Sequence, residues 1–340
     1  MKKQTKTLLI NLSAVFLWLV IAILLIARLI LTAKNAWLYC LIALVLIPIN
    51  YALSLLVHET GHVVFAAANG FKCKTVNFGL FTLDLTSGFK LSFFTFMAED
   101  GGESLFVPTK TVTKKQLKLL AFGGLAFSFI YLLAVGLLSL AFAKEVTTVM
   151  LCGLTVAGYL LTVNALPFDK TSDGAMLINK DGYVDGLCYA QNCQLAIENG
   201  LVPEQNSIEK CKNQPICVYF DYLLAVYNQN FAKAEQTVKL LYERVEDFSY
   251  DEYYLLLPEI IYWATIKNAL TEGLERRAKH LFESNLNSSA FLRAHYAYRL
   301  LKGEREWATT IKNSYDATLS KAPAFYAECE SKLISQLCKG

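Results

Sequence analysis

Four long apolar runs limit what this chain can fold into more than any other feature. Each run exceeds the ~20 residues that cross a bilayer as a helix, and they cover Leu8–Thr32, Ala36–Ala68, Leu119–Ala143 and Val146–Phe168. A chain inside lipid must satisfy its own backbone hydrogen bonds, so such runs form helices. The first run is too long for the core of a signal peptide. The sequence therefore predicts a mostly α, polytopic membrane protein with about four transmembrane helices.

Lysines are distributed unevenly around these runs. They cluster before Leu8 and between Gly70 and Leu119, whereas the other two links carry few. Because cytosolic loops collect Lys and Arg, we expect both termini in the cytosol, in a multi-pass protein of a cell membrane, by analogy the inner membrane of a bacterium. The net charge is only +3 and no basic stripe alternates with aromatic residues. The expected partner is thus the lipid bilayer and not nucleic acid.

The pattern between the second and third runs changes from helical to strand-like. Thr75–Thr86 and Phe89–Met97 are rich in Phe, Leu and Thr, and Ser87-Gly88 separates them. This predicts a membrane-associated β-hairpin within residues 71–99. Two interpretations are equally open. The hairpin is either a structural element on the membrane or a sheet edge that pairs with an extended substrate.

The second apolar run contains the sequence His58-Glu59-Thr60-Gly61-His62. Residues four apart share one face of a helix, so both histidines can bind one metal ion, and Glu59 can reach a water molecule on that ion. Two imidazoles and one carboxylate are typical of zinc sites that activate water. A chance match would give two solvated histidines, but the apolar neighbours favour a functional site because ionisable groups are costly in lipid.

A zinc ion held in this way needs a third protein ligand. His280 and His295 lie far along the polar half of the chain, so we expect a carboxylate near the end of the fourth run. Asp169 and Asp173 both lie at that depth. Spacing alone does not choose between them.

Two motifs resemble those of the site-2 protease family, which comprises zinc metalloproteases that cut within the membrane. One is the HExxH sequence of the second run. The other is Asn164-x-x-Pro167 followed by Asp173-Gly174, which is similar to the family's N-x-x-P…D-G motif. The resemblance covers about Ala36 to Gly174.

This resemblance implies a role for each motif residue. His58, His62 and Asp173 would ligate one Zn²⁺ per chain. Glu59 would be the general acid and base, and Asn164 would position or stabilise the reacting amide. The implied activity is hydrolysis of a peptide bond in a membrane-spanning or membrane-associated substrate near the cytosolic face. Such cleavage serves regulated intramembrane proteolysis or the maturation of a peptide precursor.

The resemblance also implies that residues 36–174 form a three-helix catalytic core, with an added transmembrane helix in residues 1–35. The rest of the chain, residues 175–340, would form a separate soluble domain. Two other functions compete with the protease. A non-catalytic scaffold would recruit partners through the soluble domain, but it has no chemical need for Glu59. A metal transporter would carry more polar residues along several helices, and the first and third runs are nearly free of them.

Residues 175–340 contain no run long enough to cross a membrane, and they predict a cytosolic α-helical domain. Tyr222–Val238 aligns with Tyr296–Lys312, and Tyr262–Ala278 fits the same pattern less well. Each segment has a helix, a short polar turn and a second helix. The pattern indicates degenerate tetratricopeptide-type hairpins or an α-solenoid, whose concave surface would suit a peptide or protein ligand.

Overall fold

The computed structural model describes residues 2–78, 81–86, 88–93, 104–167, 172–205, 214–243, 245, 250–284 and 286–337. This part of the chain is mostly helical, with thirteen α-helices and one small antiparallel sheet. The chain divides into two compact units, Met1–Val184 and Asp185–Gly340. This division lies beyond residue 174, the predicted end of the core.

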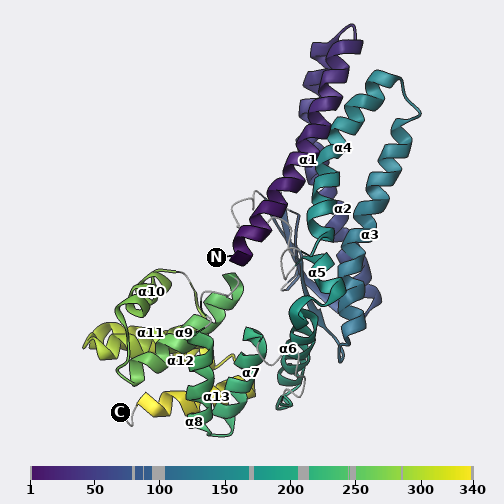
Figure 1. Cartoon of the computed structure of the whole chain (residues 1–340). Helices are drawn as coiled ribbons and strands as arrows, with labels where there is room; N and C mark the ends of the chain where they lie inside the picture. The colour runs from purple at the N-terminus through teal and green to yellow at the C-terminus, as the bar shows by residue number, and fades with distance from the viewer. Residues whose placement is uncertain are drawn as a thin grey trace. The chain divides into compact units, whose positions relative to one another are not determined.

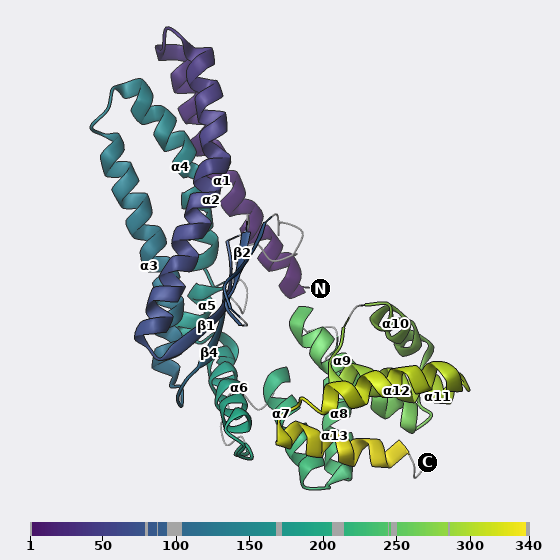
Figure 2. The same ribbon diagram turned by 180° about the vertical axis from the view of Figure 1, so that it is seen from behind.

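Four helices of the first unit are long and apolar enough to cross a membrane: α1 (Lys2–Thr32), α2 (Ala36–Ala68), α3 (Lys114–Ser139) and α4 (Lys144–Ala165). Figures 1 and 2 show them side by side, with consecutive helices running in opposite directions. The four predicted runs are thus confirmed as helices, and α2 has the predicted bounds. Helix α3 begins earlier than predicted because Thr113 and Gln116 form a capping box ahead of the apolar run.

Glycines let the helices of this unit approach one another closely. A Cβ added to Gly61 on α2 would lie 2.3 Å from the carbonyl oxygen of Gly123 on α3, so a larger residue does not fit there. Close packing of this kind holds helices together in lipid, where apolar burial does not drive association. On α4, Gly158 makes room for the ring of Trp18, whose Nε1 donates to Thr162 Oγ1 at 3.1 Å. Helix α1 therefore docks on α4.

A four-stranded antiparallel sheet with the order β3-β2-β1-β4 follows α2. Its strands are β1 (Phe71–Asn77), β2 (Phe81–Asp84), β3 (Lys90–Phe93) and β4 (Ser104–Pro108). The hairpin predicted around Ser87-Gly88 corresponds to β2 and β3, in which Asp84 pairs with Lys90. Ser87 itself and residues 94–103 lie outside the described residues.

The prediction of a simple hairpin over residues 71–99 is wrong in two respects. Thr75–Thr86 is not one strand, because the chain reverses after Asn77, where the Phe78 N–H donates to the Phe81 carbonyl at 2.9 Å. Strand β4 was not expected, and it pairs with β1 at the edge of the sheet. Its place depends on that long-range pairing and has no local sequence signal.

The sheet is tied to the adjoining ends of α2 and α3. Helix α2 ends at Ala68 with Asn69 as its C-cap, and Gly70 has a φ of +83°, which favours glycine. After β4, the backbone N–H and the hydroxyl of Thr109 donate to the Gly70 carbonyl at 3.0 and 2.8 Å. The Gln116 side chain of α3 donates to the Asn69 carbonyl at 2.9 Å. These bonds fix the sheet beside the last turns of α2.

The second unit contains three helix–turn–helix pairs. They are α7 (Pro215–Tyr227) with α8 (Phe231–Tyr242), α9 (Tyr250–Ile266) with α10 (Glu272–Phe282), and α11 (Ser289–Leu301) with α12 (Arg305–Leu319). Helix α6 (Tyr183–Glu198) precedes them and α13 (Ala324–Leu337) follows them. The predicted order of helix, turn and helix is therefore confirmed for all three segments.

The turns within these pairs have the same backbone geometry. Each contains a residue with positive φ, namely Gln229 at 57°, Asn268 at 50° and Gly303 at 72°. The next backbone N–H donates to the carbonyl five residues earlier, as in the 2.8 Å bond from Asn230 to Ala225. This bond is the longer one of a Schellman motif, which ends a helix in a left-handed residue. The assignment to tetratricopeptide-type hairpins stays a prediction.

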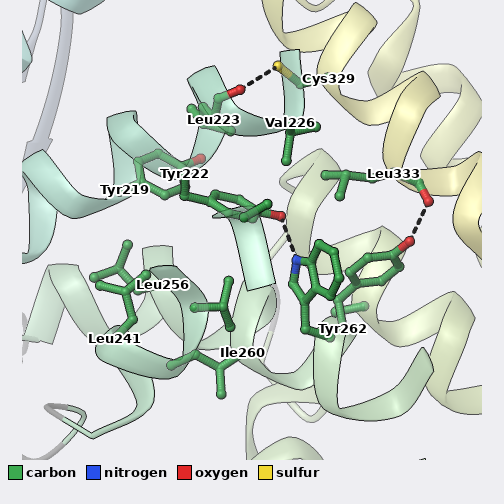
Figure 3. Packing of buried hydrophobic residues seen from close by; sticks show 14 of the residues in the cluster. Tyr219, Tyr222, Leu223, Val226, Leu241, Leu256, Ile260, Tyr262, Cys329 and Leu333 are labelled. Carbon is green, nitrogen blue, oxygen red and sulfur yellow. Dashed lines mark hydrogen bonds between the residues drawn. The ribbon is translucent and has the colours of Figure 1, made fainter. Parts of the chain in front are cut away.

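Helix α13 packs back onto the first helices of the pairs. Figure 3 shows Cys329 and Leu333 of α13 facing α7 and α9. The Cys329 Sγ lies 3.5 Å from the carbonyl oxygen of Leu223, and the Tyr262 hydroxyl donates to the Leu333 carbonyl. In an open solenoid each repeat contacts only its neighbours. Here the C-terminal helix covers part of α7 and α9, so this face is filled by the chain itself.

A buried charge cluster lies in this core. Arg293 on α11 is 0% exposed and donates to both carboxylate oxygens of Glu259 at 2.8 Å and to Oε2 of Glu330 at 2.8 Å. The Tyr222 hydroxyl donates to Glu259 at 2.6 Å, and the Tyr315 hydroxyl donates to Glu330 at 3.1 Å. The cluster therefore connects α7, α9, α11, α12 and α13.

Candidate metal centre

Three side chains that can bind metal converge in the first unit. His58 and His62 come from α2, and Asp173 is the first residue of α5 (Asp173–Ile178). Oδ2 of Asp173 lies 3.2 Å from Nε2 of His58 and 3.5 Å from Nε2 of His62, and the two Nε2 atoms are 3.2 Å apart. All three residues are buried. This is a His-His-Asp group that can hold one metal ion.

The imidazoles are oriented by α3. The Nδ1 of His62 lies 2.9 Å from the carbonyl oxygen of Leu120, which accepts only, so Nδ1 carries the proton and Nε2 keeps its lone pair. The Nδ1 of His58 lies 2.9 Å from the hydroxyl oxygen of Ser128, which is also buried. Metal-binding histidines are held in this way by a partner on their other nitrogen. Both Nε2 atoms are thus directed at the same point.

Gly124 makes this arrangement possible. A Cβ added there would lie 2.5 Å from Nε2 of His62 and 2.8 Å from Cε1 of His58. The backbone of α3 therefore approaches the two rings at a distance that excludes any side chain. Of the two neighbouring glycines of α3, Gly123 packs against α2 at Gly61 and Gly124 makes room for the histidines.

Asp173 is placed by the contact between the start of α5 and the end of α4. Ser172 caps α5 by accepting a hydrogen bond from the backbone N–H of Ala175 at 3.3 Å. A Cβ added to Gly174 would lie 1.9 Å from the Ala165 carbonyl oxygen, so the first turn of α5 lies directly against the end of α4. The D-G sequence therefore combines a ligand with a residue that permits this contact. The alternative ligand Asp169 lies outside the described residues.

The donor set fits a divalent cation. Oδ2 of Asp173 is buried and has no hydrogen-bond partner in the described part of the chain. It faces Nε2 of His58 at 3.2 Å and Nε2 of His62 at 3.5 Å. Burying three electron-pair donors together is costly unless a positive charge satisfies them. One ion bound by two imidazoles and one carboxylate would remove that cost and leave further coordination positions open.

Glu59 lies beside this group and is only 3% exposed. Its Oε2 accepts a hydrogen bond from the hydroxyl of Ser104, the first residue of β4. On strand β1, burial raises the pKa of the Cys73 thiol, and the negative charge of Glu59 raises it further. The sheet therefore covers the side of α2 that carries the predicted general base.

Asn164, in the last turn of α4, shares a small cavity with His58. The other polar residues that line this cavity are Ser54, Ser128 and Tyr131. The structure thus places all five predicted site residues in one region of the first unit. Just beyond Asn164, the carbonyl of Pro167 accepts a hydrogen bond from the ammonium of Lys180.

The chain was compared with protein-family models, with curated proteins and with solved structures. It matches none of them. The interpretation of the site therefore rests on its own geometry.

Two residues of the site were not predicted. Ser128 has a sequence signal, because it is one of only two serines in the apolar third run. Ser104 has none, because its contact with Glu59 depends on the pairing of β4 with β1. Conversely, His280 and His295 belong to the second unit, as expected from their distance in the sequence.

Proposed function

We propose that this protein is an intramembrane zinc endopeptidase of the site-2 protease type. One observation carries the proposal. His58, His62 and Glu59 lie on a helix long and apolar enough to cross a membrane, and the buried Asp173 of α5 meets the two histidines with an oxygen that has no hydrogen-bond partner among the described residues. This combination suits the hydrolysis of a peptide bond at a metal within the membrane.

His58, His62 and Asp173 would hold the zinc ion, which, when bound, polarises the substrate carbonyl and makes a water molecule more acidic. Glu59 takes a proton from the attacking water and later delivers it to the leaving amine, so the peptide C–N bond breaks and one water is consumed. The Asn164 amide donates to the carbonyl oxygen as negative charge develops on it. Burial of Glu59 keeps bulk water away from this proton transfer.

The same proposal includes the side of the membrane at which the substrate is cut and the strand that it joins. The lysines near the ends of the helices favour a cytosolic position for both termini and for the sheet. The metal group lies at the end of α2 that adjoins the sheet, so cleavage occurs near the cytosolic face. Strand β4 is one of the two edges of the described sheet and lies beside Glu59, so an extended membrane-associated peptide can add to it.

Zinc content and cleavage of a transmembrane reporter peptide test this function. We expect the wild type to bind one zinc ion and to cut. Glu59→Gln should keep zinc and lose cleavage by at least about 100-fold, whereas Asp173→Ala should lose much of both. Glu145→Gln, the same change in the first turn of α4, serves as the control. A folded wild type that binds no zinc would refute the protease and favour a membrane scaffold.

The second unit supports a recruiting role beside the catalytic one. Its three helix pairs share one turn geometry, which favours degenerate tetratricopeptide-type hairpins. Such units bind peptides or protein segments, and we propose a protein ligand for this unit. Since α13 covers part of α7 and α9, a ligand of that face has to displace α13 or bind elsewhere.

A further inference from the structure

Strand β4 runs along the metal-binding helix and is tied to it at both ends. At one end the Ser104 hydroxyl donates to Glu59, and at the other Thr109 donates twice to the Gly70 carbonyl. From Glu59 to Gly70 a helix rises about 16 Å, and from Ser104 to Thr109 a strand spans about 17 Å. Because these lengths agree, both ties form at once without distortion of either element.

The register of β4 directs Ser104 toward α2. Ser104 pairs with Val76 of β1, and a bulge between Cys73 and Thr75 shifts the pairing by one residue. Along a strand, alternate side chains share a face. Phe106 is 8% exposed and Leu105 is 52% exposed, so Ser104 lies on the buried face with Phe106. A one-residue slip would turn Ser104 away from the helix, and bulges of this kind re-aim side chains next to functional sites.

The Ser104 hydroxyl supplies a hydrogen-bond donor to the buried Glu59 carboxylate. A buried carboxylate is costly without a hydrogen-bond donor, and the structure shows Ser104 as the donor to Oε2. Glutamate has three rotatable side-chain bonds, so one bond to a fixed strand selects a single orientation of the carboxylate. Proton transfer requires the carboxylate within hydrogen-bond reach of the attacking water.

We propose that Ser104 is the positioning residue of the general base: its hydroxyl holds the Glu59 carboxylate where that group exchanges a proton with water. The proposal rests on the proposed function for its catalytic meaning. It assigns to the sheet a second task, because the strand that presents an edge to substrate also orients the base. Ser104 acts through Glu59 and does not itself touch the reacting atoms.

A double-mutant cycle on the metal-free full-length protein in detergent tests the contact without relying on activity. Ser104→Ala should lower the thermal midpoint by about 3–6 °C, because it leaves a buried carboxylate without its donor. In a Glu59→Ala background the same change should have little further effect. Equal losses in both backgrounds would overturn the proposal, since Ser104 would then act somewhere other than at Glu59.

Cleavage kinetics test the consequence. Ser104→Ala should lower kcat by about 10- to 100-fold and leave KM and zinc content unchanged. Ser104→Thr keeps a hydroxyl and should restore most of the rate. Ser92→Ala on β3, at the opposite edge of the sheet, is the matched control. Equal loss in the Thr variant, or a change in KM alone, would overturn the positioning role. An inactive wild type refutes the proposed function instead, and the cycle still decides whether Ser104 holds Glu59.

Discussion

The two units of this protein each bury a cluster of ionisable side chains, but they balance the charge differently. In the second unit Arg293 places a guanidinium between Glu259 and Glu330, at 2.8 Å from each carboxylate. In the first unit the groups that the structure brings to Asp173 are two imidazoles, at 3.2 and 3.5 Å. One cluster contains its own permanent cation, and the other is arranged around a point where a cation would sit.

This difference separates a structural cluster from a ligand site. Buried carboxylates are costly unless a positive charge and hydrogen bonds compensate them. In the second unit Tyr222 and Tyr315 also donate to the two glutamates, and the atom without a hydrogen-bond partner among the described residues is Nη1 of the cation, Arg293. In the first unit the atom without such a partner is a carboxylate oxygen, Oδ2 of Asp173. The cluster that has a carboxylate and no permanent cation is therefore the better candidate for binding a cation from outside the chain.

Removing the cation from the second cluster gives the largest expected effect. Arg293→Met leaves two buried glutamates without their partner, and we expect it to destabilise the second unit by about 3–5 kcal/mol. Hydrogen exchange of the full-length protein in detergent measures this as lost protection of amides in α9 and α11. Arg293→Lys keeps a positive charge and should lose less of this amide protection. Unchanged protection in Arg293→Met would show that the cluster does not need its guanidinium.

Hydrogen exchange also tests the first cluster, where a chelator removes the metal. The expected loss of protection is confined to α5 and the last turns of α2, because those segments carry the ligands. Asp173→Asn protein should not respond to the chelator, and the helices of the second unit should not respond in either protein. If the chelator lowered amide protection in the second unit alone, the metal would be bound there and the comparison of the two clusters would be wrong.

The sequence predicts the first cluster far better than the second. The four apolar runs and the HExxH spacing are local patterns, so the helices and the shared face of His58 and His62 were predictable. The choice of Asp173 came from a resemblance, because the spacing of two carboxylates does not show which one a turn directs inward. Arg293 gave no signal at all. A single arginine in an amphipathic helix is usually solvated, and its burial depends on glutamates 34 and 37 residues away.

The sheet illustrates the same limit. A hairpin around Ser87-Gly88 was predictable from turn residues, and β2 and β3 confirm it. The pairing of β4 with β1, and with it the contact of Ser104 with Glu59, depends on a register shift at Cys73 and Thr75. Such long-range pairings are determined by tertiary packing and have no local pattern.

A smaller effect is expected at Gly124, where the histidines of the first cluster leave no space for a side chain. In Gly124→Ala the new methyl group would occupy the space of both imidazoles, at 2.5 Å from His62 Nε2. We expect the free energy of unfolding to fall by about 1–3 kcal/mol and the variant to lose most of the bound zinc. Gly136→Ala is a matched control on the same helix, because a Cβ there meets nothing within 4 Å. Zinc content and thermal midpoint measure both variants. Full zinc in Gly124→Ala would show that α3 does not shape the site.

The smallest expected effect concerns the protonation of Glu330 in the second cluster. Burial raises the pKa of Glu330 above its ordinary 4.5, although the charge of Arg293 opposes this shift. Between about pH 4.5 and the raised pKa, the folded unit therefore holds a proton that the unfolded chain has released. The stability from this proton is complete below about pH 4.5 and is lost as pH rises through the raised pKa.

Glu330→Gln should remove this dependence, because an amide does not titrate. The free energy of unfolding of the second unit, measured by hydrogen exchange between about pH 4 and about pH 8, should then fall less steeply with pH than in the wild type. The change should be smaller than the loss in Arg293→Met. Glu328→Gln, an exposed position on the same helix, is the control. If both variants keep the wild-type slope, Glu330 is ionised in the fold, and Arg293 alone balances two carboxylates.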